Sequence, residues 1–205
     1  MSKIILHLCA DIGSDSRYYD LDPTYEVIKV GEDVGVENYN PPANVHGIIA
    51  NPVCTEFSTA RSDGKARNNP EGMFLVDHCL RIIKLAAPQW WVLENPARGT
   101  LKDHLGKPEH VYQPWHYGSP WTKSTALWGN FVMPDKLFTD YSKVVENPNL
   151  YKRPTRPKVS LAFLHKSAIE FMPEYEWCKH RIETDRDLRS LCSDGFAREF
   201  YRSNP

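Results

Sequence analysis

The 205-residue sequence has no run of about 18 apolar residues, the length that a helix needs to cross a membrane. Its first residues, MSKIILHLCADIG, also lack the long apolar stretch and the small-residue cleavage site of a secretory signal. These absences argue against a membrane protein and against a secreted protein. We therefore expect a cytoplasmic protein with no membrane partner.

Cysteine is sparse, and no two cysteines form a Cys-x-x-Cys pair. The five residues are Cys9, Cys54, Cys79, Cys178 and Cys192. An odd number at scattered positions argues against a disulfide framework and against a structural zinc site, so we predict no metal ligands. At least one of these thiols is then free and needs another explanation.

The chain also lacks an excess of charge of either sign, with 25 Lys and Arg residues against 26 Asp and Glu residues. This balance excludes a general attraction to polyanions but not a local basic surface. Residues 151–158 (YKRPTRPK) are one candidate for such a surface. Two interpretations stay open for this segment: it binds phosphate groups, or it is a solvated linker.

Apolar residues make up 41% of the sequence, which is enough for one core in a chain of this length. We predict a single domain over residues 1–205. Residues 1–130 carry the motifs described below, and residues 131–205 form an irregular basic segment that ends in a short helix. Ser193 and Asp194 are the candidate N-caps of that helix.

Short apolar runs that end in polar residues alternate with longer segments along residues 1–130. We predict strands at residues 4–9, 25–31, 45–50, 89–95 and 124–128. Apolar residues at spacings of three and four predict a helix over residues 70–88. This order indicates an α/β fold, with a mostly parallel sheet and helices on both faces. Ligands bind such sheets at the carboxyl ends of the strands.

Cys54 directly follows the third predicted strand, in the polar loop NPVCTEFS. At the rim of a cleft, adjacent amides or the start of a helix would lower the pKa of its thiol and make it a nucleophile. The alternative is a small residue of the core, because free cysteines are often buried.

Glu94 follows a run of apolar and aromatic residues in WWVLENP. A carboxyl group at the end of a buried strand loses hydration, which would raise its pKa and let it hold a proton; the alternative is a solvated acid. Together with the thiol of Cys54, such an acid suits covalent attack on an electron-poor ring. Substitution at C5 of cytosine has this requirement, since a thiolate adds to C6 while an acid at N3 balances the charge.

The segments LHLCADIG, NPVCTEFSTAR, WWVLENP and HYGSPWTKSTALWGN resemble, in this order, the motifs of the C5-cytosine DNA methyltransferases, in the short form common in phage genomes. The resemblance covers residues 4–130 and is most specific in the two middle segments. It implies a Rossmann-like fold that binds S-adenosylmethionine, methyl transfer to cytosine in DNA, and a target base rotated out of the helix.

The resemblance assigns roles to individual residues. Cys54 matches the nucleophile of the family, and Pro52 matches the first proline of its Pro-Pro-Cys motif, with Val53 in place of the second. Glu94 matches the acid at the N3 edge of cytosine. Lys123 is the one cation where the family has Gln-x-Arg-x-Arg, and we assign it a catalytic role. We predict substrate binding by Ser58, Asn95 and Pro96.

The cofactor motif departs from the family pattern. In ADIGSDS, Gly13 is kept but Asp11 occupies a glycine position where the backbone usually approaches the ligand. After the second strand, either Glu32 or Asp33 is expected to hold the ribose hydroxyls. The predicted cofactor-binding residues are Asp11, Ile12, Gly13, Glu32, Asp33, Asn51 and Pro52. Asp11 and Glu32 are alternatively a turn residue and a surface acid.

No separate target-recognition domain is visible in residues 130–205. Three consequences are open: relaxed specificity through phosphate contacts of residues 152–158, a protein partner that supplies recognition, or RNA as the substrate. Five tryptophans could stack against a flipped base, but we expect at least three of them in the core. They are Trp90, Trp91, Trp115, Trp121 and Trp128.

Two other functions compete with cytosine methylation. One is a catalytically inactive methyltransferase-like protein that binds nucleic acid or a protein partner; the altered first loop and the missing Gln-x-Arg-x-Arg motivate it. The other is methylation of an amino group, with NPVC in place of an Asn-Pro-Pro-aromatic motif. This second option is weaker, because Val53 and Cys54 supply no aromatic ring to stack on the base.

Overall fold

The computed structural model describes residues 2–10, 12–58 and 69–205. In this part of the chain, six strands form one sheet in the order β2-β1-β3-β4-β7-β5. The strands are β1 (Lys3–Leu8), β2 (Tyr25–Val30), β3 (Val45–Ala50), β4 (Trp90–Pro96), β5 (His110–Tyr112) and β7 (Thr125–Asn130). β1 pairs in parallel with β2 and β3, and β3 with β4, whereas β7 is antiparallel to β4 and β5. The prediction of a mostly parallel α/β sheet is confirmed.

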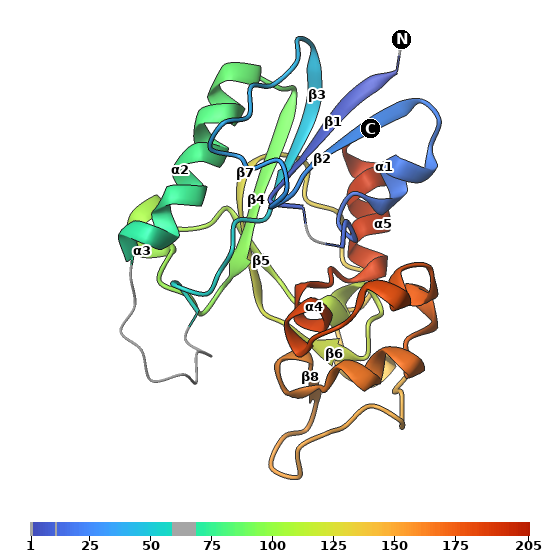
Figure 1. Cartoon of the computed structure of the whole chain (residues 1–205). Helices are drawn as coiled ribbons and strands as arrows, with labels where there is room; N and C mark the ends of the chain where they lie inside the picture. The colour runs from blue at the N-terminus through green and yellow to red at the C-terminus, as the bar shows by residue number, and fades with distance from the viewer. Residues whose placement is uncertain (1, 11, 59–68) are drawn as a thin grey trace.

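Helices cover both faces of this sheet (Figure 1). On one face lies α2 (Asn69–Ala86), and on the other lie α1 (Arg17–Leu21) and α5 (Asp194–Ser203). Side chains of one strand alternate between the two layers. In β4, Leu93 packs in the apolar cluster of α2, while Trp90 and Val92 pack in the cluster that includes residues of α1 and α5. Burial on both faces explains why the parallel strands read as continuous apolar runs.

A third apolar cluster lies in the C-terminal part of the chain. Residues 144–158 contain no helix or strand, but residues 159–192 form a series of short elements rather than the irregular structure expected there. The remaining elements are α3 (Lys102–Leu105), η1 (Pro114–Tyr117), β6 (Trp121–Thr122), η2 (Tyr141–Lys143), β8 (Val159–Ser160), η3 (Leu161–Phe163), η4 (Lys166–Phe171), η5 (Pro173–Arg181) and α4 (Asp185–Ser190). β6 and β8 pair in parallel as a second, two-stranded sheet.

This third cluster is shared between distant parts of the chain. It includes Ile12 from the loop after β1 and Trp121 from β6. Arg181 also donates a hydrogen bond to the carbonyl oxygen of Ile12 at 2.8 Å. These contacts support our proposal that residues 1–205 form a single domain.

Three of the five tryptophans singled out from the sequence are buried in the core, as expected: Trp90, Trp121 and Trp128. Trp91 and Trp115 are half-buried. Within the described residues, no helix combines the length and the apolar character that crossing a membrane requires. All five cysteines are free, which agrees with the prediction that they form no disulfide framework.

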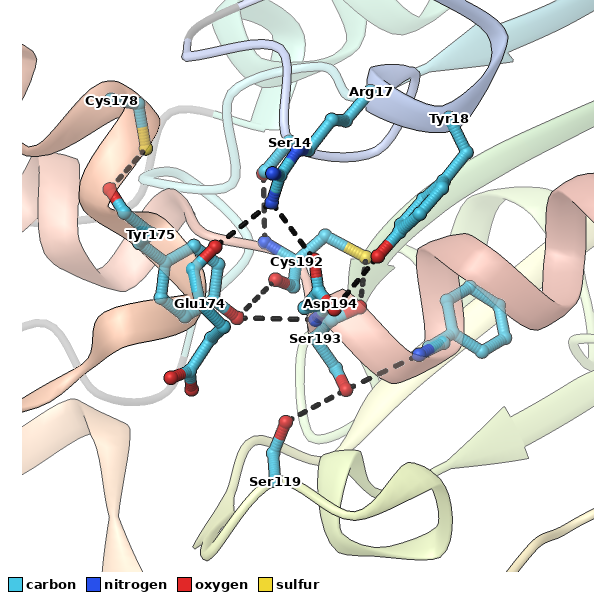
Figure 2. Close-up of polar contacts among 11 residues, drawn as sticks. Ser14, Arg17, Tyr18, Ser119, Glu174, Tyr175, Cys178, Cys192, Ser193 and Asp194 are labelled. Atoms are coloured by element: carbon cyan, nitrogen blue, oxygen red, sulfur yellow. Dashed lines mark hydrogen bonds and ion pairs between the residues drawn. The ribbon is translucent and has the colours of Figure 1, made fainter. Parts of the chain in front are cut away.

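A hydrogen-bond network joins the segment before α5 to the loop after β1 and to α1 (Figure 2). Arg17 donates to the Glu174 carbonyl oxygen at 2.8 Å and to Asp194 Oδ1 at 3.0 Å. The backbone N–H of Cys192 donates to Ser14 Oγ at 2.9 Å. These contacts fix the loop after β1 against the C-terminal part of the chain, although the two are far apart in sequence.

The first turn of α5 packs unusually close to η1. Ser193 caps the helix, since its Oγ accepts from the Phe196 N–H at 3.4 Å. Of the two predicted N-caps, Ser193 is confirmed, whereas Asp194 is the first residue of the helix. Gly195 follows within the first turn, and a Cβ there would lie 1.9 Å from the Tyr117 carbonyl oxygen. We expect Gly195→Ala to lower the free energy of unfolding by about 2–3 kcal/mol, because backbone would have to move. Urea denaturation measures this change.

The matched control is Arg202→Ala in the last turn of α5. Its side chain is 62% exposed and pairs with Glu199 at 2.8 Å. Exposed pairs of this kind contribute at most about 1 kcal/mol. Equal stability losses in the two variants would contradict the close approach at Gly195.

Candidate active site

A cavity of about 260 Å³ opens at the carboxyl ends of β1, β3 and β4. Its walls come from the loops that follow these strands, from the residues before β7 and from α4. Carboxyl ends of parallel strands meet at one edge of a sheet, so this is the place expected for a ligand. The predicted site residues that line it are Ile12, Gly13, Asn51, Pro52, Cys54, Ser58, Glu94, Pro96 and Lys123.

Cys54 lies in the turn that follows β3, where its carbonyl oxygen accepts from the Phe57 N–H at 3.0 Å. Burial raises the pKa of the Cys54 thiol, and the nearby Glu94 carboxylate raises it further. Lys123 and Arg186 lower this pKa but do not reverse its direction. The prediction of a lowered pKa is therefore wrong, because Cys54 lies in a half-buried turn beside a carboxylate rather than at the start of a helix.

This raised pKa predicts a specific pH dependence. A thiol with a raised pKa has less thiolate at pH 7.5 than an unstructured cysteine, so Cys54 should react more slowly with iodoacetamide. Its rate should rise about tenfold per pH unit and level off above the range of an unperturbed cysteine. Lys123→Met removes a charge that lowers the pKa, so it should slow the reaction further. Mass spectrometry of the Cys54 peptide measures these rates.

Lys102→Met is the matched control for this experiment. Lys102 is an exposed residue of α3 outside the cavity lining. We expect this variant to alkylate like the wild type. A Cys54 rate that levels off at neutral pH would contradict the raised pKa.

Glu94 and Lys123 form an ion pair inside the cavity, with 3.8 Å between Oε1 and Nζ. Only 16% of the Glu94 side chain and 22% of the Lys123 side chain are exposed. Nζ of Lys123 also donates to the carbonyl oxygens of Ser190, at 3.5 Å, and Leu191, at 3.4 Å. Burial by itself would lower the pKa of Lys123, but the charges of Glu94 and other nearby groups raise it overall. Lys123 therefore stays charged and connects the acid to the end of α4.

The predicted substrate-binding residue Asn95 does not line the cavity. It is fully buried, and its Nδ2 donates to the Pro52 carbonyl oxygen at 3.1 Å. This bond connects the end of β4 to the loop that carries Cys54. Asn95 thus positions the two strand ends relative to each other, while the neighbouring Pro96 reaches the cavity wall.

The loop after β1 forms one end of the cavity. Gly13 has a φ of +84°, which favours glycine, and a Cβ there would lie 3.1 Å from Lys29 Cε. Asp11, predicted to bind the cofactor, lies outside the described residues. Glu32 and Asp33 are exposed beyond the end of β2 and do not line the cavity. Their assignment to the ribose hydroxyls stays a prediction.

The sequence analysis missed His7, which lines the cavity although it is only 1% exposed. Its Nδ1 lies 2.8 Å from Ser16 Oγ, and burial lowers the pKa of the ring, which favours the neutral form at pH 7. His7 Nε2 and the buried Asn51 Oδ1 make no hydrogen bond of normal geometry within the described residues, but the two side chains interact with each other, and this contact raises the pKa of the ring against the effect of burial. The sequence feature that could have indicated His7 is its position as a polar residue inside the apolar run IILHLC.

Other residues missed from the sequence are Ser14 and Asp15, which follow Gly13, and Arg186, Arg189 and Ser190 of α4. No local pattern indicated the α4 residues, because only the fold brings them to the cavity. Across the described residues, no group of three or more His, Cys, Asp or Glu side chains is placed to hold a metal ion.

Comparison with known proteins supports the fold. No family model and no curated protein matches this sequence. Among solved structures, it is similar to one described as a candidate DNA modification methyltransferase encoded within a prophage of E. coli. The TM-score is 0.50 at 16% sequence identity, and the match covers 76% of this chain and 56% of that one. This protein therefore shares its α/β fold with a chain described as a DNA modification methyltransferase.

Proposed function

We propose that this protein transfers a methyl group from S-adenosylmethionine to C5 of cytosine in DNA, through a covalent adduct at Cys54. The observation that supports it best is that Cys54, Glu94 and the loop after β1 line one cavity at the carboxyl ends of β1, β3 and β4. A nucleophile, an acid and a candidate cofactor loop thus face the same space.

Each catalytic residue has a distinct task in this proposal. Glu94, ionised opposite Lys123 in the free protein, takes up a proton from solvent as the base binds. The thiolate of Cys54 then adds to C6 of cytosine while Glu94 donates this proton to N3, which balances the negative charge that develops in the ring. C5 then becomes the nucleophile. After methylation, the C5 proton passes to solvent water, N3 returns its proton to Glu94, and release of the Cys54 sulfur as thiolate restores the ring. Lys123 holds Glu94 in place through their 3.8 Å ion pair.

The residues around the loop after β1 fit a polar cofactor. The side chains of His7 and Asn51 interact with each other at the cavity without a hydrogen bond of normal geometry, so a polar ligand could compete for them. Ile12, Gly13, Asn51 and Pro52 are the residues that would hold S-adenosylmethionine. When bound, this cofactor supplies an electrophilic methyl group.

DNA is the proposed substrate because the similar structure is described as a DNA modification methyltransferase. The cavity is a pocket at the end of a sheet, so a base inside a duplex must leave the stack to reach Cys54. This chain spans 56% of the length of that structure. A protein partner that supplies target recognition is also part of the proposal.

The test is transfer of a labelled methyl group. Full-length protein is mixed with S-adenosylmethionine carrying a tritiated methyl group and with unmodified DNA, and the DNA is hydrolysed to nucleosides. We expect the label in 5-methylcytosine. RNA of the same sequence, run in parallel, tests the alternative substrate. Label in neither nucleic acid would contradict the proposal.

An inactive methyltransferase-like protein is the second candidate. Glu32 and Asp33 lie outside the cavity, so its lining contains neither of the acids predicted to hold the ribose hydroxyls. Calorimetry distinguishes the two candidates, since micromolar binding of S-adenosylmethionine argues against an inactive descendant. Methylation of an amino group is not favoured by any contact in the cavity.

A further inference from the structure

The rim of the cavity carries two arginines that neither the motifs nor the proposed chemistry uses. Arg186 and Arg189 lie three residues apart on α4, so their side chains leave the same face of the helix. Both line the cavity, and both are exposed to solvent. Leu188, on the opposite side of α4, is fully buried in the third apolar cluster. The helix therefore presents its basic face to the cavity.

α4 is short, yet three contacts hold it in position. At its start, Thr184 Oγ1 accepts from the Asp187 N–H at 3.2 Å, and Asp187 Oδ2 accepts from the Thr184 N–H at 2.7 Å. Burial of Leu188 anchors its middle. At its end, Lys123 donates to the Ser190 carbonyl oxygen at 3.5 Å. Because Lys123 also pairs with Glu94, the arginines stand in a defined relation to the catalytic acid.

Among the described residues, the charged side chains that line the cavity are Lys123, Arg186, Arg189, Asp15 and Glu94, and Glu94 pairs with Lys123. Arg189 pairs with Asp185 at 3.4 Å, but no acidic side chain in the described part of the chain lies within ion-pair distance of Arg186. Arg186 is also near enough to Cys54 to lower the pKa of its thiol. An anion at this rim would thus lie next to the base that Cys54 attacks.

The basic segment 152–158 is less suited to this role. Lys158 Nζ lies 4.5 Å from the ring centres of both Trp115 and Tyr141, and Arg153 stacks on Phe163. None of the residues 152–158 lines the cavity with Cys54. Phosphate contacts from that segment would not place a nucleotide at the nucleophile.

We propose that Arg186 and Arg189 bind the phosphate groups that flank the target nucleotide. A guanidinium group matches a phosphate with two parallel hydrogen bonds, which fixes position as well as charge. The two residues would set the depth to which the flipped nucleotide enters the cavity. This inference rests on the proposed function, because it takes nucleic acid as the ligand.

The test measures DNA binding in the absence of methyl transfer. Fluorescence anisotropy of a short fluorescein-labelled duplex is recorded with full-length protein, without cofactor, over a series of salt concentrations. Each phosphate contact contributes about 0.9 to the salt slope. We expect Arg186→Gln and Arg189→Gln each to weaken binding about fivefold near 0.1 M salt and to lower the slope by about 0.9, and the double variant to lower it by about twice as much.

Arg202→Gln is the matched control, because Arg202 is an exposed arginine of α5 outside the cavity lining. It should bind DNA like the wild type. Arg186→Lys keeps the charge and should retain most of the salt slope. Thermal unfolding of each variant verifies that the fold is intact. Unchanged DNA affinity and slope in the double variant would overturn the inference.

A second measurement tests whether the two arginines bind DNA phosphates or the carboxylate of the cofactor. Calorimetry with S-adenosylmethionine should give the same affinity for the wild type and the double variant. A loss of cofactor affinity with intact DNA binding would overturn the inference. Wild-type protein that binds DNA through these arginines without methylating it would refute only the proposed function. Methyl transfer that is insensitive to both substitutions would refute only the inference.

Discussion

Replacing Cys54 with alanine is expected to abolish methyl transfer, with a loss of at least about 10³-fold. The thiol supplies the bond to C6 without which C5 of cytosine is too weak a nucleophile. Cys54 is half-buried at the cavity rather than in the apolar core. The substitution should therefore leave the fold intact, and the loss should come from chemistry. Tritium transfer to DNA measures the effect.

The same residue should be trapped by DNA that contains 5-fluorocytosine. Release of the sulfur requires loss of the substituent at C5 as a cation, which a proton allows and fluorine does not. We expect a covalent protein–DNA adduct, and mass spectrometry of its peptides should locate the bond at Cys54. The adduct should be absent in Cys54→Ala.

Cys178→Ala is the matched control for both measurements. Cys178 is another free cysteine, located in η5 outside the cavity lining, where its Sγ donates to the Tyr175 carbonyl oxygen at 3.4 Å. This variant should methylate and form the adduct like the wild type. Methyl transfer that survives in Cys54→Ala, or an adduct at a different cysteine, would contradict the proposed nucleophile.

Glu94→Gln is expected to slow methyl transfer by about 10²–10⁴-fold. Glutamine keeps the size of the side chain but cannot carry the negative charge that pairs with Lys123 in the free protein, nor the proton that Glu94 would donate to N3 once the base is bound. The negative charge of the attacked ring then has no acid to balance it. Steady-state rates on one DNA substrate measure the loss.

The reactivity of Cys54 in this variant gives a second and opposite readout. Glu94 raises the pKa of the Cys54 thiol, so removal of its charge lowers that pKa and increases the thiolate fraction at neutral pH. Iodoacetamide should therefore modify Cys54 faster in Glu94→Gln while methylation becomes slower. A general loss of structure would also expose Cys54 and speed its alkylation, so thermal unfolding must first show that Glu94→Gln is as stable as the wild type.

Glu176→Gln serves as the control, since the Glu176 side chain is 74% exposed and pairs with Lys179 at 3.8 Å on the surface of η5. It should change neither rate. Glu94→Gln protein with normal methylation would show that Glu94 is not the acid. Slower alkylation of Cys54 would show that the carboxylate does not act on the thiol.

Local periodicity predicted the long elements well. The apolar spacing predicted β3 at its observed bounds and α2 to within two residues at each end. It could do so because burial of a strand or of one face of a helix leaves a regular apolar spacing in the sequence. The three-residue β5 was too short to leave such a pattern. The C-terminal region has a different apolar spacing, which did not enter the prediction. Ile169, Met172, Tyr175 and Cys178 are buried at intervals of three residues, the period of the 3-10 helices found there.

The candidate site was predicted in part, for a general reason. Parallel strands end at the same edge of a sheet, so polar residues that follow them must lie near one another, as Cys54 and Glu94 do. The direction of the pKa shift of Cys54 could not be predicted in this way. It depends on burial and on the distance to Glu94, neither of which is a property of the local sequence.

The amino-acid sequence by itself determined the α/β class, the strands of the parallel sheet and the edge at which reactive groups gather. These follow from short-range apolar patterns. Only the tertiary structure decided that α4 covers that edge, that Lys123 joins Glu94 to the end of this helix, and that Arg186 lines the same cavity as Cys54. The physical reason is that burial of Leu188 in a separate apolar cluster holds α4 there, and contacts between distant segments leave no periodic trace in the chain.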